Sequence, residues 1–188
     1  MRWLDWSLVA HDETSVTLAC AVRPQPGYEW QFDLQVTYAL SPVGLVVTCR
    51  AVNVDREPAP FGVGFHPYLA LGTAVDGLTP TVPATTCLEP ASRAGGPVSQ
   101  SQGRRRTHPP RQIGSTQLDT AFGSLVRGDD GRAVARLQDP DSGRSLHLWV
   151  DGSYRYLMVY TADQVSRPER RRAAAPRRAS TMLTLPMA

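Results

Sequence analysis

An alternation of apolar and polar residues with a period of two is the feature that most constrains the fold of this chain. In the segment "EWQFDLQVTYAL" (residues 29–40), every second residue is large and apolar: Trp30, Phe32, Leu34, Val36, Tyr38 and Leu40. Successive side chains of a β-strand point to opposite faces, so this pattern predicts a long strand with one buried face. The turn "SPVG" at 41–44 and a second alternating run, "LVVTCRAVNV", predict that this strand forms a hairpin with its neighbour.

Further segments have the same period. They are "SVTLACAV" (15–22), "RAVARL" (132–137), "RSLHLWV" (144–150) and "RYLMVYT" (155–161), and the turn-rich "QDPDSG" and "DGSY" that separate the last three are hairpin signals. No stretch has the i, i+3, i+4, i+7 spacing of an amphipathic helix with caps. We therefore expect an all-β fold, an antiparallel β-sandwich or barrel with little helix.

Length and composition indicate one ordinary globular domain. The chain has 188 residues, of which 41% are hydrophobic, and no apolar run approaches the roughly 18 to 20 residues that span a bilayer. We expect no membrane segment. The N-terminal segment does not resemble a secretion signal, so we expect a cytoplasmic protein. Cys20, Cys49 and Cys87 are odd in number and form no CxxC pair, which argues against a disulfide framework or a zinc site. We interpret them as reduced core residues.

Two segments have the composition of loops or tails. Residues 89–117 are rich in glycine, proline, serine and arginine without periodicity, which predicts a long loop. Residues 167–178, "RPERRRAAAPRR", hold six arginines and one glutamate. We predict a β-domain over 1–165 and a poorly ordered tail over 166–188. The alternative is a basic segment that binds nucleic acid. The sequence argues against this alternative, because the basic segment lacks interleaved aromatic residues that could stack on bases.

The segment "FGVGFHPYLALG" (61–72) carries the clearest signal for a functional site. If it is a strand, Phe61, Val63 and Phe65 lie on one face, while Gly62, Gly64 and His66 lie on the other. Glycine within a strand marks a place where something approaches the backbone closely. The following proline restricts the backbone of His66, whose imidazole can exchange protons near neutral pH. A catalytic histidine and a histidine that merely bonds a backbone carbonyl both fit these residues.

The longer segment "NVDREPAPFGVGFHPYLALG" closely resembles the histidine-containing segment of the aldose 1-epimerases, the galactose mutarotase-like proteins. The resemblance extends from the N-terminus to about residue 165, through "QLDTAF" and "RYLMVYTADQ". It implies a galactose mutarotase-like supersandwich with a sugar-binding cleft on one sheet. It implies no metal and no organic cofactor, and a small sugar, an aldohexose, as the partner.

The resemblance also implies roles for individual residues. Mutarotation opens the pyranose ring by protonating the ring oxygen while a base removes the proton of the anomeric hydroxyl, and His66 matches the general acid of the family. Asp119 in "QLDTAF" matches an aspartate that binds sugar hydroxyls, although a turn residue is its other reading. Gly64 would leave room for the sugar. Tyr68 would supply an apolar wall, and core packing explains it equally well.

The chain departs from the family pattern at both ends. An arginine and a second histidine of the family's sugar site lie upstream of the strand that "RWLDW" resembles, so we expect an incomplete sandwich that is truncated at the N-terminus. The family's general base is a glutamate near the C-terminus, where this chain reads "RRASTMLTLPMA". Met158 stands where many relatives have a sugar-binding glutamine. Two hypotheses remain: an aldose 1-epimerase that acts on a hexose, and a remnant that is inactive or only binds sugar.

Overall fold

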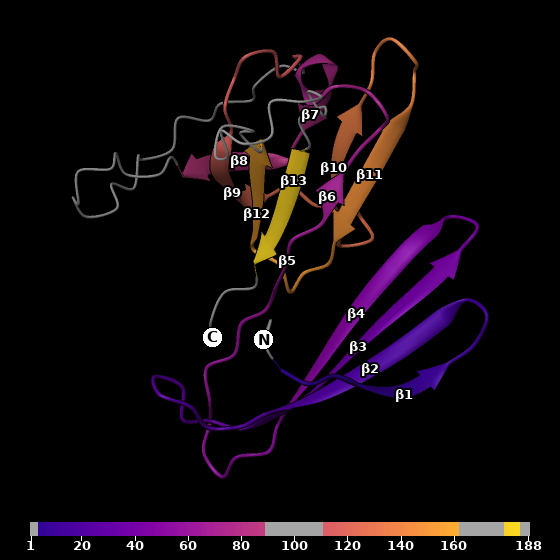
Figure 1. Ribbon diagram of the computed structural model, residues 1–188. Coiled ribbons are helices and arrows are strands. Elements are labelled where there is room, and N and C mark those ends of the chain that lie inside the picture. Colours follow the sequence, from indigo (N-terminus) through magenta and orange to yellow (C-terminus); the bar gives the residue numbers. More distant parts are fainter. Residues whose placement is uncertain (1–3, 89–110, 162–178, 185–188) are drawn as a thin grey trace, which may run out of the picture. The chain divides into compact units, whose positions relative to one another are not determined.

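The computed structural model describes residues 4–88, 111–161 and 179–184 (Figure 1). Within these ranges the regular elements are β-strands, apart from the short 3₁₀ helix η1 (Val75–Gly77). All strand pairs are antiparallel. The all-β prediction is therefore confirmed. The chain forms two compact units, 1–60 and 61–188, whereas the sequence suggested one domain through residue 165. Each unit is described separately below.

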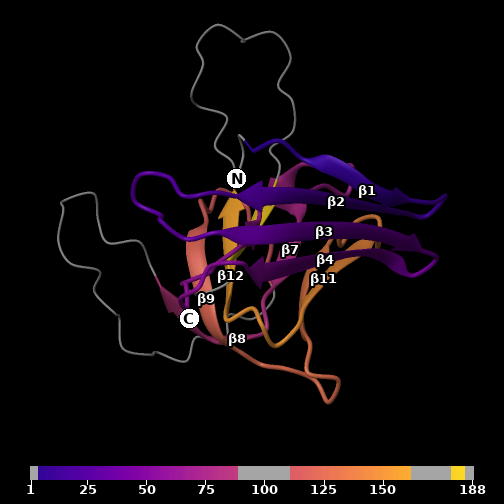
Figure 2. The same cartoon turned by 90° about the horizontal axis from the view of Figure 1, so that it is seen from below.

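The first unit is a four-stranded meander in which strands follow one another in sequence order (Figure 2). Its strands are β1 (Ser7–His11), β2 (Ser15–Val22), β3 (Phe32–Ser41) and β4 (Gly44–Asn53). The register of β3 and β4 is unbroken from the Phe32–Asn53 pair to the Ser41–Gly44 pair, so the predicted hairpin is confirmed. One face of the meander is apolar, and Cys20, Leu34 and Val36 are buried on it.

The second unit contains two sheets. The larger sheet consists of β5 (Gly64–Phe65), β6 (Tyr68–Leu69), β8 (Ala84–Leu88), β9 (Asp119–Leu125), β12 (Tyr156–Thr161) and β13 (Ala179–Thr184). Its strand order is β5-β13-β12-β9-β8. β6 also pairs with β13, on the same side as β5 and nearer the start of β13. The smaller sheet has the order β11-β10-β7 and consists of β7 (Thr79–Thr81), β10 (Ala133–Gln138) and β11 (Ser145–Val150).

The two sheets of the second unit enclose an apolar core. Leu157 from β12 packs with Ala133 from β10 and Val150 from β11, and all three are almost completely buried. A second cluster forms around η1 and includes Leu78, Ile113 and Leu137. Burial of aliphatic side chains on the inner faces of two sheets is the main stabilisation of a sandwich. The face of the large sheet that points away from this core is more exposed, so a functional site on this sheet would lie there.

The structure differs from two predictions, one about a hairpin and one about the tail. β11 and β12 do not form a hairpin, since they lie in different sheets. The guanidinium of Arg127 holds this crossing by donating hydrogen bonds to the carbonyls of Gly131, Val150, Asp151 and Tyr154. In addition, Ala179–Thr184 of the predicted tail form β13, because β12 pairs with them on one side and β5 and β6 on the other. The rest of the tail and residues 89–110 of the predicted loop lie outside the described residues, and the boundary at 165 stays a prediction.

Candidate functional site

His66 lies at an interruption in the strand pairing of the large sheet. The sequence predicted one continuous strand over 61–66, but the structure has the two short strands β5 and β6 with His66 and Pro67 between them. A proline has no N–H to donate to a ladder, which explains the break. The predicted alternation holds nevertheless, since Gly62, Gly64 and His66 are exposed while the apolar residues between them are covered.

The aromatic ring of Tyr68 lies next to His66. The centroids of the two rings are 5.0 Å apart and their planes are tilted by 39°. Residues two apart in extended chain point to the same side, so both rings stand on the same face of the sheet. Tyr68 is largely exposed, which excludes the reading of this residue as core packing. The pair presents an imidazole and a phenol side by side at the surface.

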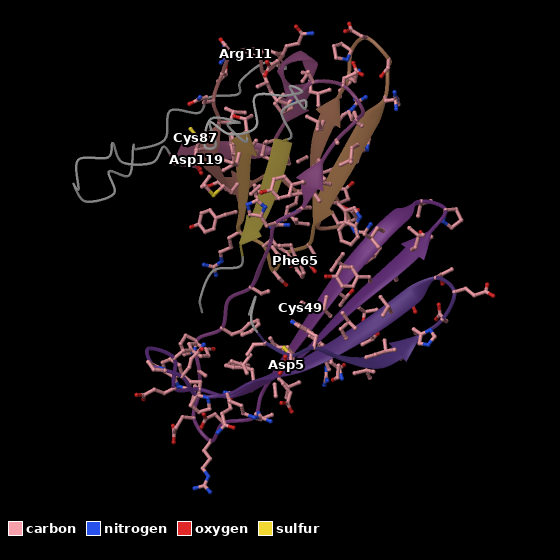
Figure 3. The ribbon with its side chains drawn as sticks, viewed as in Figure 1. Asp5, Cys49, Phe65, Cys87, Arg111 and Asp119 are labelled. Atoms are coloured by element: carbon pink, nitrogen blue, oxygen red, sulfur yellow. The ribbon has the colours of Figure 1, made fainter. Side chains whose placement is uncertain are left out.

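Strand register places Asp119 on this face as well. Tyr68 is paired with Ser180, Ser180 with Tyr160, and Tyr160 with Asp119, so these residues form one row across four strands. Directly opposite residues of a sheet have side chains on the same face. Three spacings of 4.7–4.9 Å separate the first and last strands of the row, about 14 Å. Figure 3 shows Asp119 on the large sheet, with Phe65 on the same sheet toward its opposite end.

The alternation along β12 shows which face of the sheet is covered. Leu157, Val159 and Thr161 are buried in the core, whereas Tyr156, Met158 and Tyr160 between them are more exposed. We call the face away from the core the open face. Its described side chains and glycines are Gly64, His66, Tyr68, Thr86, Asp119, Ala121, Gly123, Tyr156, Met158 and Tyr160. The structure thus brings all four predicted site residues, Gly64, His66, Tyr68 and Asp119, onto one face.

Tyr156 was not among the site residues predicted from the sequence. It lies on the open face at the start of β12. Its ring lies against the backbone of Gly123, where an added Cβ would be 3.1 Å from the ring and 3.1 Å from Oγ1 of Thr86. Only a glycine leaves the ring this space. The alternation in "RYLMVYT" already indicates that Tyr156, Met158 and Tyr160 share a face, but it does not show that this face is the open one.

Acidic groups are scarce on this sheet. Asp119 is the only acidic residue in its described strands, and β13, which lies between β12 and the strands that flank His66, contributes none. β13 belongs to the C-terminal segment where the resemblance implied a glutamate. Among the described residues, no group of three His, Cys, Asp or Glu side chains is placed to hold a metal ion. In that part of the chain there is also no helix long and apolar enough to cross a membrane.

Comparisons with solved structures agree with this architecture. The galactose mutarotase related enzyme of Lactobacillus acidophilus superimposes with a TM-score of 0.72 at 15% sequence identity, over 98% of this chain and 60% of that structure. A galactose mutarotase-like protein from Lactobacillus casei ATCC 334 gives a TM-score of 0.61 at 22% identity, over 97% of this chain and 62% of that structure. The fold is therefore the galactose mutarotase-like β-sandwich predicted from the sequence.

Sequence comparisons identify the family. The uncharacterized protein YihR of Escherichia coli K12 is 40% identical over 78 residues, which are 40% of this chain and 25% of that protein. The chain therefore spans a quarter of the length of this curated relative and less than two thirds of each solved structure. The family model described as aldose 1-epimerase matches residues 1–181. A match over nearly the whole chain shows that this protein belongs to the aldose 1-epimerase family.

Proposed function

We propose that the open face binds an aldose and that the protein interconverts the α and β anomers of a hexose such as glucose or galactose, with His66 as general acid. The observation that carries this proposal is the position of His66, Tyr68 and Asp119. His66 and Tyr68 come from one segment and Asp119 from another far along the sequence, and all three lie on one exposed face of the sheet. Membership of the aldose 1-epimerase family supports the reaction type.

The geometry suits a proton donor that acts on a bound sugar. His66 is exposed, Pro67 restrains its backbone, and the neighbouring Gly64 places no side chain on the face. An acid that is held in place can stay within hydrogen-bond reach of the ring oxygen during the reaction. His66 and Asp119 are too far apart to touch each other directly. A sugar between them would receive a proton at one end and donate hydroxyl hydrogen bonds to the carboxylate at the other.

The decisive test is polarimetry of freshly dissolved α-glucose and α-galactose. We expect the protein to accelerate the relaxation of optical rotation. His66→Ala should reduce the catalysed rate by a factor of about 10²–10⁴, which is the usual contribution of a general acid. His147→Ala is the matched control, because His147 is an exposed histidine on β11, outside the large sheet. Equal activity of the two variants, or no acceleration by the parent protein, would contradict the catalytic assignment.

A second function, sugar binding without turnover, is favoured by the absence of an acidic residue from β13. Loss of one partner of an acid–base pair commonly costs a factor on the order of 10²–10⁴ in rate, so binding would persist while catalysis fell toward the background rate. Isothermal titration calorimetry separates the two functions. Heat of sugar binding together with unchanged optical relaxation identifies the binding protein, and binding with acceleration identifies the epimerase.

We further propose that the protein works in the cytoplasm. Cys20, Cys49 and Cys87 are all free thiols in the structure, and burial raises the pKa of Cys20 and Cys49 above its usual range. Unpaired cysteines of this kind persist in reducing compartments. The raised pKa values of Cys20 and Cys49 keep these two thiols protonated and unreactive.

A further inference from the structure

The edges of the sheets differ in how well they are protected from pairing with another chain. An unpaired edge strand invites further strands unless it is short, broken, bulged or charged. Among the described edge strands, β7 has three residues and contains Pro80, and β5 and β6 are interrupted by Pro67. The register of β1 shifts between Leu8 and Ala10, which marks a bulge. β8 and β11 are short, with five and six residues.

β4 has only one of these protections, the single charged residue Arg50 in its C-terminal half. It is a ten-residue edge strand in unbroken register with β3, and no described strand pairs with its other side. The sequence over 36–49, "VTYALSPVGLVVTC", contains no charged residue, and its one proline lies in the turn. Uncharged segments with high β-propensity and no proline are the ones that pair readily with other strands. β4 is therefore the edge most able to accept a partner.

The apolar face of the meander becomes exposed at the turn end of the β3–β4 hairpin. Leu40 and Leu45 are directly opposite each other at the end of the hairpin and are 60% and 56% exposed. Val43 in the turn is almost completely exposed, and Tyr38 is partly so. Large exposed apolar side chains that gather in one place are typical of an interaction site. A partner strand added at β4 would continue the sheet and place its side chains beside Leu45.

We propose that β4 pairs antiparallel with β4 of a second copy of this chain to form a symmetric dimer. Identical strands meet without like-charge repulsion where the paired segment is neutral, and residues 44–49 of β4 fulfil this condition, with Arg50 just beyond them. In such a two-fold arrangement Leu45 and Val47 of each copy lie beside the other copy's strand. Pairing consumes the exposed edge of both copies, so this contact stops at two chains.

The mass of the full chain in solution tests the proposal. Light scattering after size exclusion should give twice the chain mass of 20.5 kDa at high concentration and a dissociation constant that is insensitive to salt. Leu45→Lys should weaken the dimer on the order of 100-fold, because it places two like charges at the interface. Leu45 is exposed, so this variant should still fold, and circular dichroism checks that it does.

Gln35→Lys is the matched control. Gln35 is an exposed residue on β3 that points to the opposite face, one strand away from the edge, so the same added charge should leave the dimer unchanged. Three results would overturn the proposal: a mass of one chain at all concentrations, open-ended assembly, or equal weakening by Leu45→Lys and Gln35→Lys. Association that salt disrupts would also overturn it, since that outcome assigns the contact to charged residues elsewhere.

Discussion

Asp119 stands about three strand spacings, roughly 14 Å, from the strand of Tyr68, and this separation limits what its carboxylate can do. If it only accepts hydrogen bonds from sugar hydroxyls, it stabilises the bound sugar and the transition state equally. Asp119→Asn should then raise KM about tenfold or more and leave kcat nearly unchanged, as expected for loss of a charged hydrogen-bond acceptor. Initial polarimetric rates over a range of sugar concentrations measure both constants.

Asp129→Asn is the control for this residue, since Asp129 is an exposed carboxylate in a loop outside the large sheet. A large fall in kcat for Asp119→Asn with KM unchanged would show that Asp119 is the base of the reaction and does more than bind. That result would also explain how a sheet with one acidic residue in its described strands supports acid–base chemistry.

At the scale of elements, the contact between β9 and β12 includes a glycine, Gly123, beneath the aromatic ring of Tyr156. Gly123→Ala would place a methyl group 3.1 Å from the Tyr156 ring and from Oγ1 of Thr86. Because Tyr156 is partly exposed, its ring can move, and we expect a loss of about 1 kcal/mol in the free energy of unfolding. Chemical denaturation measures this loss. Gly152→Ala is the control, since an added Cβ there meets no atom within 4 Å.

The double variant identifies the cause of that loss. In a Tyr156→Ala background the ring is gone and only Oγ1 of Thr86 remains close, so Gly123→Ala should cost clearly less than in the parent protein. If Gly123→Ala costs the same in both backgrounds, the ring is not what requires a glycine.

At the scale of the whole molecule, one carboxylate in each unit links stability to acid pH. Hydrogen bonds from the Thr14 amide and from Ser15 lower the pKa of Asp12 from 3.8 to about 2. The hydroxyl of Ser142 is the main cause of the lowered pKa of Asp139. A folded pKa below the unfolded value stabilises the native state above the unfolded pKa. This contribution is lost as the pH falls through 3.8 toward the folded pKa.

Unfolding by denaturant at a series of pH values checks this linkage. The parent protein should lose stability from about pH 5 downward, where carboxylates of the unfolded chain begin to bind protons. Asp12→Asn and Asp139→Asn should each be less stable at neutral pH and should show a shallower fall in acid. Asp129→Asn, which removes an exposed carboxylate in a turn, is the control variant for the comparison of slopes. Parallel curves for all four proteins would disprove the assignment.

Strands with strong alternation could be located from the sequence, and strands without it could not. β2, β3 and β4 follow the predicted segments to within about three residues, because each has apolar residues at every second position. β13 reads "ASTMLT" and was assigned to a tail. Its strand conformation depends on neighbours on both sides, β12 and the β5–β6 pair, which are distant in sequence. Propensity is too weak to show such a strand in advance.

The sequence by itself determined the all-β class, the faces on which residues of one strand lie, and the histidine–proline pair that indicated the family. These properties are local, because side-chain direction alternates with each residue whatever the strand packs against. Only the tertiary structure decided that Asp119 shares a face with His66 and Tyr68, and that this face is open. Strand order and register arise from pairing between distant segments, so they are set when strands meet and bury one common core.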